Sequence, residues 1–121
     1  LWGDLDGTKD IFQFTEASIK QNRDGSNLVA MITSFERGYD VINFSTIDID
    51  PKKTGRQGLF LSDNGKFNGK AGELVVSSAV LVRGSWMVTL SGDLDGKNGA
   101  DFQIQVFMDK TGTLGINNFR F

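Results

Sequence analysis

The chain has 121 residues, a formal net charge of −2, 39% apolar residues, and neither cysteine nor histidine. This composition excludes disulfides, zinc sites built on thiolate or imidazole ligands, and histidine-dependent catalytic triads. The acidic balance argues against nucleic acid as a partner, and no apolar run approaches the roughly 18 residues that a membrane span requires.

Short apolar stretches between turns rich in glycine predict an all-β chain. Strands are expected at residues 10–14, 28–35, 40–50, 59–62, 73–82, 85–91 and 102–107, with one helical turn near residues 16–20 and inward-facing phenylalanines at 119 and 121. No long stretch has a 3.6-residue period. We therefore predict a single domain over residues 1–121, folded as a β-roll end or β-sandwich of seven to nine short strands.

The segment Gly-Asp-Leu-Asp-Gly occurs twice, at residues 3–7 and 92–96, and each copy is followed by another aspartate and a strand with an aromatic residue. Calcium takes six to eight oxygen ligands, so a flexible loop of aspartate and glycine suits it. The copies predict a calcium site in one or both of two sets, Asp4, Asp6 and Asp10, and Asp93, Asp95 and Asp101. The alternative is a tight turn in which aspartate caps its own backbone.

A second acidic group comprises Asp40, Asp48 and Asp50, with Glu36 nearby. If residues 40–50 form a strand, Asp48 and Asp50 share one face, and Ile42, Phe44, Ile47 and Ile49 point inward. Asp40 is counted among the candidate calcium ligands. The alternative for this group is a solvated strand face.

Other functional assignments have weaker support. Trp2, Tyr39 and Trp86 could stack on sugar rings, although single aromatic residues in strands are more often part of a core. No pair among the 15 acidic residues is singled out for glycosidase chemistry, so we do not expect an enzyme. The basic residues Lys52, Lys53 and Arg56 are interpreted as a solvated loop.

Four blocks carry a family resemblance: LWGDLDGTKDIFQF (1–14), ITSFERGYDVINFSTID (32–48), FNGKAGEL (67–74) and GDLDGKNGADFQIQV (92–106). In this order they resemble the C-terminal domain of serralysin-type (peptidase M10) metalloproteases, which other secreted repeats-in-toxin (RTX) proteins share. By this resemblance, residues 1–14 are the remnant of the last RTX-like turn and residues 15–121 form the C-terminal β-sandwich cap. The chain differs from the family pattern at Ser34 and Asn43, where aspartate is usual, and at Asn117 and Asn118, where an acidic residue is usual.

The resemblance implies a non-catalytic module that caps a calcium-binding β-roll and supports calcium-coupled folding and type I secretion. The implied cofactor is Ca²⁺, the implied partners are upstream RTX repeats of the parent chain and the type I secretion machinery, and the implied location is extracellular. The zinc motif of the proteases needs histidine, so no proteolysis is implied for this chain. The alternative function is an extracellular module that binds a polysaccharide or a protein on one face of the sandwich.

Overall fold

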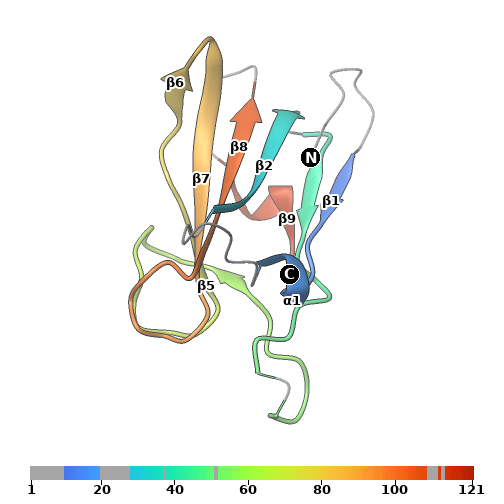
Figure 1. The fold of residues 1–121 in the computed structure, drawn as a ribbon, viewed down its shortest axis with the longest axis vertical. Coiled ribbons are helices and arrows are strands. Elements are labelled where there is room, and N and C mark those ends of the chain that lie inside the picture. The colour runs from blue at the N-terminus through green and yellow to red at the C-terminus, as the bar shows by residue number, and fades with distance from the viewer. Residues whose placement is uncertain (1–9, 20–27, 37, 51, 109–111, 113) are drawn as a thin grey trace.

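The computed structural model describes residues 10–19, 28–36, 38–50, 52–108, 112 and 114–121. These residues form nine short strands in two sheets, one short helix and one 3-10 turn (Figure 1). The elements are β1 (Ile11–Gln13), α1 (Glu16–Ile19), β2 (Leu28–Phe35), β3 (Val41–Asn43), β4 (Phe60–Leu61), β5 (Glu73–Val76), β6 (Val80–Val82), β7 (Ser85–Asp93), β8 (Phe102–Met108), η1 (Ile116–Asn118) and β9 (Phe119–Arg120). The predicted all-β class is confirmed. Within these residues, no helix has the length and apolar character needed to cross a membrane.

The smaller sheet contains three strands in the order β1-β3-β9, and both pairings are parallel. Its register places Phe12 beside Ile42 and Ile42 beside Phe119. All three side chains are buried, because alternate residues of a strand share one face. The sheet therefore joins segments from both ends of the chain through a single apolar face.

The larger sheet has the order β2-β8-β7-β5-β4, with β6 paired to β7. The β2–β8 and β4–β5 pairs are parallel, whereas β7 runs antiparallel to β5, β6 and β8. Strand β8 shows the predicted alternation, since Phe102, Ile104 and Val106 are buried while Gln103 and Gln105 are half-buried. Strand β8 thus sends one apolar row to the core.

Buried side chains from both sheets form one core. A ring contact between Phe12 of β1 and Phe35 of β2, with centroids 6.0 Å apart, links the two sheets. Phe44 contacts the rings of Phe119 and Phe121, so the predicted inward position of the C-terminal phenylalanines is confirmed. The buried apolar residues are Phe12, Phe14, Ile19, Ile32, Phe35, Ile42, Phe44, Ile47, Leu59, Leu74, Val88, Leu90, Phe102, Ile104, Val106, Met108, Leu114 and Phe119.

The predicted strand at residues 73–82 is wrong in one respect, because it is two strands. Val76 pairs with Leu90 and Val80 pairs with Met87. Between these two pairs, three residues (77–79) lie opposite two residues of β7. One extra residue on one side is the definition of a β-bulge. The bulge ends β5 and starts β6.

The predicted strand at residues 40–50 is also too long. The Asn43 side chain accepts a hydrogen bond from the backbone N–H of Ser45 (2.8 Å), and the chain turns there. Ile47 is buried as expected, but Asp48 and Asp50 lie in the following loop and not on a strand face. The strand therefore ends where the Asn43 side chain bonds to the backbone two residues further on.

Candidate metal site

Residues 93–101, here called the acidic loop, connect β7 to β8. Across the base of the loop, the Asp101 N–H donates to the carbonyl of Gly92 (2.7 Å). The side chains of Asp93, Asp95 and Asp101 each offer one carboxylate oxygen, and these oxygens lie within 4.8 Å of one another. Asp93 is buried, whereas Asp95 and Asp101 are exposed. The loop thus gathers an acidic triad that could hold a metal ion.

The buried member of the triad, Asp93, organises the loop. One of its oxygens accepts the N–H groups of Asp95 (3.2 Å) and Gly96 (2.8 Å), and the other accepts the N–H of Asn98 (3.0 Å). A buried carboxylate is stable only where donors replace its lost water. These three amides satisfy Asp93 and wrap the backbone around it.

The two exposed members are less fully bonded. Asp101 uses Oδ2 to accept the N–H groups of Leu94 (2.7 Å) and Asp95 (3.3 Å), while Asp95 uses Oδ1 to accept the N–H of Lys97 (3.1 Å). Asp95 Oδ2 and Asp101 Oδ1 accept no hydrogen bond from the described residues. A cation could therefore bind these two oxygens without displacing a protein donor.

Charge is concentrated at the triad. Within the described part of the chain, one ion pair occurs, between Lys53 and Asp50 (3.9 Å), and it lies outside the acidic loop. In those residues no Lys or Arg forms an ion pair with the three carboxylates, although Lys97 lies in the same loop. Carboxylate and backbone carbonyl oxygens are hard donors, so the loop suits a hard cation better than a soft one.

The acidic loop lies against residues 62–72, here called the amide loop, which connects β4 to β5. The two loops run side by side in Figure 1. At Gly96, a side-chain Cβ would lie 3.1 Å from the backbone nitrogen of Ala71 and 3.2 Å from the carbonyl oxygen of Gly69. Gly96 also has φ +75°, a conformation that other residues rarely adopt. The glycine therefore permits the close approach.

Glu73 closes the amide loop, and the sequence analysis did not single it out. Its buried carboxylate accepts the backbone N–H of Asn68 (2.5 Å) and the Asn68 side-chain amide (2.7 Å). The pKa of Glu73 lies below its ordinary value of 4.5, mainly because the backbone N–H of Asn68 donates a hydrogen bond to its carboxylate. Burial acts in the opposite direction and raises the pKa. Glu73 is the first residue of β5 and pairs with Asp93 of β7, a pairing of distant residues that the sequence does not reveal.

Of the other predicted calcium ligands, the structure describes Asp10 and Asp40. Asp40 is buried, and its carboxylate accepts the backbone N–H groups of Asp10 (2.9 Å) and Glu36 (2.8 Å). It therefore joins the chain before β1 to the end of β2. Asp4 and Asp6 lie outside the described residues, so their role stays a prediction. In the described ranges, only the acidic loop brings three potential ligand side chains together.

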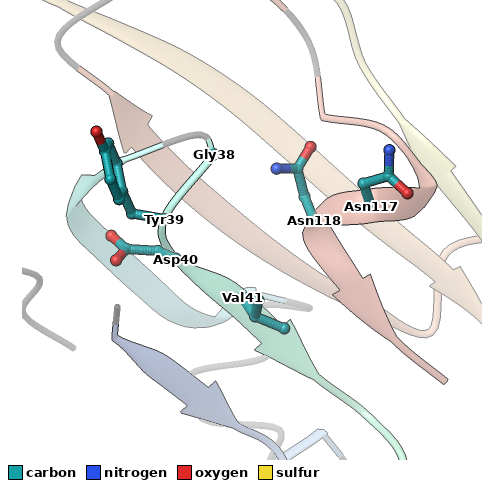
Figure 2. Close-up of a pocket in the computed structure, with 6 residues that line it drawn as sticks. All are labelled: Gly38, Tyr39, Asp40, Val41, Asn117 and Asn118. Carbon is teal, nitrogen blue, oxygen red and sulfur yellow. The ribbon is translucent and has the colours of Figure 1, made fainter. Parts of the chain in front are cut away.

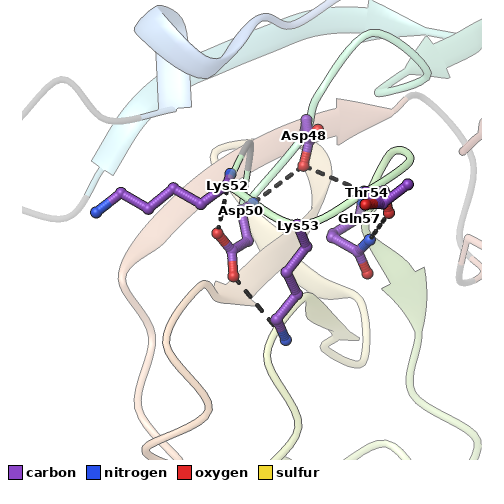
Figure 3. A network of polar contacts seen from close by, with 6 residues as sticks. All are labelled: Asp48, Asp50, Lys52, Lys53, Thr54 and Gln57. Atoms are coloured by element: carbon purple, nitrogen blue, oxygen red, sulfur yellow. Dashed lines mark hydrogen bonds and ion pairs between the residues drawn. The ribbon is translucent and has the colours of Figure 1, made fainter.

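Asp48 and Asp50 organise a different loop, shown in Figure 3. Asp48 Oδ1 accepts the N–H groups of Asp50 (3.0 Å) and Gln57 (3.1 Å). Asp50 accepts the N–H of Lys52 (3.3 Å) and pairs with Lys53. These carboxylates are used in closing their own loop, so they do not form the solvated strand face that was the alternative expectation.

Two of the three aromatic residues considered for sugar binding fall within the described part of the chain. Tyr39 is 52% exposed, Trp86 is half-buried at the start of β7, and Trp2 lies outside the described residues. A pocket of about 440 Å³ lies between the loop after β2 and the turn before β9 (Figure 2). It is lined by Gly38, Tyr39, Asp40, Val41, Asn117 and Asn118.

No family model matches the chain, and no curated protein matches its sequence. The resemblance to serralysin-type and RTX proteins rests on the four sequence blocks alone. Calcium binding, secretion and partners therefore remain implications of this resemblance.

Proposed function

We propose that this chain is a non-catalytic, calcium-binding module that caps the end of a β-roll in an extracellular RTX protein exported by type I secretion. The observation that carries the proposal is the acidic triad Asp93, Asp95 and Asp101, gathered by one short loop. Calcium would offset two of the three negative charges of the carboxylates and fix the loop between β7 and β8. Because a cation that binds only the folded chain stabilises it, folding would depend on calcium.

The edge of the smaller sheet supports the capping role. The N–H of Val41 in β3 donates to the carbonyl of Asp10 (2.9 Å), so alternate residues of the β1 segment bond to β3. The backbone groups of Ile11 and Gln13 consequently point away from β3, toward the outer edge of the sheet. This sheet is parallel throughout, and a coil of a parallel β-roll could add to the same edge. A repeat stack needs such a terminal unit to cover its last coil.

The bonding of the buried carboxylates supports a non-catalytic role. In Asp40, Glu73 and Asp93, both carboxylate oxygens accept hydrogen bonds from the chain itself. A general acid or base needs a lone pair or proton that is directed at a substrate. These three groups instead hold backbone segments together.

Calorimetric titration of the calcium-stripped chain with calcium tests the proposal. Asp95→Asn is the sharpest variant, since Asp95 closes less of the loop than Asp93 does. We expect saturable binding to the native chain, weakened at least tenfold by Asp95→Asn. The matched control is Asp63→Asn, at an exposed carboxylate outside the loop, which should bind like the native chain. Absence of a binding isotherm with the native chain would refute calcium binding.

A second candidate function is binding of a neutral saccharide, which the pocket in Figure 2 favours. The exposed Tyr39 ring provides an apolar face, and the amides of Asn117 and Asn118 provide donors and acceptors for hydroxyl groups. Retention on immobilised polysaccharides, compared between the native chain and Tyr39→Ala, tests it. Equal retention of both proteins would mean that Tyr39 does not bind the saccharide.

A further inference from the structure

Three asparagines in the chain are followed directly by glycine, at residues 64–65, 68–69 and 98–99. In such a pair the backbone nitrogen of the glycine can attack the asparagine side-chain carbonyl, because glycine has no Cβ to obstruct the approach. The reaction requires the side chain to rotate toward that nitrogen. The Asn-Gly pair is the same at all three positions, so the structure around each pair is expected to dominate their relative reactivity.

The amide loop holds two of these asparagines in place. Asn64 Oδ1 accepts hydrogen bonds from the Ser62 hydroxyl (3.0 Å), the Lys66 N–H (3.1 Å) and the Asn68 side-chain amide (3.1 Å). The Asn68 amide also donates to the carbonyl of Lys66 (3.0 Å) and to Glu73 (2.7 Å). Rotation of either side chain would break several hydrogen bonds at once.

Asn98, in the acidic loop, lacks such restraint. Its side chain forms no hydrogen bond with the described residues, and both Asn98 and Gly99 are exposed. No atom lies within 4 Å of the position that a Cβ of Gly99 would occupy. The Asn98 amide lies near Gly69, where a Cβ would be 3.7 Å from Asn98 Oδ1. It has no hydrogen bond to the described residues to break before it turns toward the Gly99 nitrogen.

We propose that Asn98 is a site of spontaneous modification, at which asparagine converts to aspartate and isoaspartate. The Gly99 nitrogen forms a bond to Cγ of Asn98 and loses its proton, while the bond from Cγ to the side-chain nitrogen breaks and ammonia leaves. Water then adds to one carbonyl of the resulting cyclic imide and breaks one of its two C–N bonds. The balance is one water consumed and one ammonia released.

The conversion changes the acidic loop itself. It adds one negative charge to a chain with net charge −2, in a loop that already carries three carboxylates. The isoaspartate product also inserts a carbon into the backbone next to the Asn98 N–H, which donates to Asp93 (3.0 Å). The modification would therefore alter the loop as the protein ages, whether or not the loop binds calcium.

Peptide mapping by mass spectrometry measures the three rates in one sample. Trypsin cleaves after Arg56, Lys66, Lys70 and Lys97, so each Asn-Gly pair falls on its own peptide. In the native protein, held in mildly alkaline buffer, we expect Asn98 to react about tenfold faster than Asn64 and Asn68, a difference of about 1.4 kcal/mol in barrier. In denaturant the three rates should converge. Equal rates in the native protein, or the same difference in denaturant, would overturn the proposal.

Two variants separate the chemistry from loss of folding. Gly99→Ala should slow the reaction at Asn98, and the open space around Gly99 lets the fold accept the methyl group. Ser62→Ala removes one hydrogen bond to Asn64 and should speed the reaction there while the rate at Asn98 stays the same. An unchanged Asn98 rate in Gly99→Ala would contradict attack by the Gly99 nitrogen.

Discussion

The acidic loop and the amide loop lie side by side but satisfy their polar groups in opposite ways. In the amide loop, the side chains of Asn64 and Asn68 form hydrogen bonds with each other, and Asn68 also donates to Glu73 at the end of the loop. In the acidic loop, three carboxylates meet and accept hydrogen bonds from backbone amides. Carboxamides both donate and accept, whereas carboxylates only accept. The polar side chains of the amide loop therefore satisfy one another by hydrogen bonds. The acidic loop, by contrast, retains negative charge that a cation could offset.

The comparison also separates two roles of a carboxylate within one loop. Asp93 is buried and bonded at both oxygens, so its removal affects the fold. Asp95 is exposed and bonded through one oxygen, so its removal mainly changes charge. Structure and cation binding can therefore be tested by different substitutions.

The largest expected effect is that of Asp93→Ala. The change leaves three backbone N–H groups of the acidic loop without their acceptor, and we expect a loss of about 3 kcal/mol in the free energy of unfolding. Urea unfolding measures it. Asp63→Ala, at an exposed carboxylate, should change stability by less than about 0.5 kcal/mol. Equal effects of the two substitutions would mean that Asp93 does not organise the loop.

An intermediate effect is expected from Gly96→Ala, which tests the contact between the loops. The new methyl group would meet the amide loop at 3.1 Å, at a residue with φ +75°. We expect a loss of about 1 to 2 kcal/mol, from the left-handed conformation alone. Gly99→Ala, in open space within the same loop, is the matched control and should be near neutral in thermal unfolding. A harmless Gly96→Ala would show that the loops are not closely packed.

The smallest expected effect is that of Glu73→Gln, and it depends on pH. Because folding lowers the pKa of Glu73, its charge contributes stability above the ordinary value of 4.5, and this contribution is lost as pH falls through the lowered pKa. The variant should be less stable than the native chain at neutral pH, and the gap should close in acid. Melting temperatures across that range measure this. Parallel curves for the two proteins would contradict the assignment.

The sequence predicted strands correctly where buried and solvent-facing residues alternate along the chain. The alternation of Phe102, Ile104 and Val106 with glutamines identified β8, because one face meets the core and the other meets solvent. Sequence failed where side chains bond to the backbone. The hydrogen bond from Ser45 to Asn43 ends β3, and the extra residue at 77–79 splits one predicted strand into two.

The candidate site was predictable in part, for a similar reason. Asp93, Asp95 and Asp101 are close in sequence, so a single tight loop brings them together. Glu73 was not predictable in this way, because its importance arises from the pairing of β5 with β7, which joins residues far apart in the chain. Asp40 was assigned as a ligand, but the structure shows that it joins backbone segments near β1 and β2.

Thermal unfolding with and without calcium tests the central claim most directly. If the acidic loop binds calcium in the folded chain alone, calcium at about 100 times its dissociation constant adds about 2.7 kcal/mol of stability. The melting temperature should then rise with calcium in the native chain and rise much less in Asp95→Asn. Superimposed melting curves for the calcium-loaded and calcium-stripped native chain would contradict a calcium-binding role for this module.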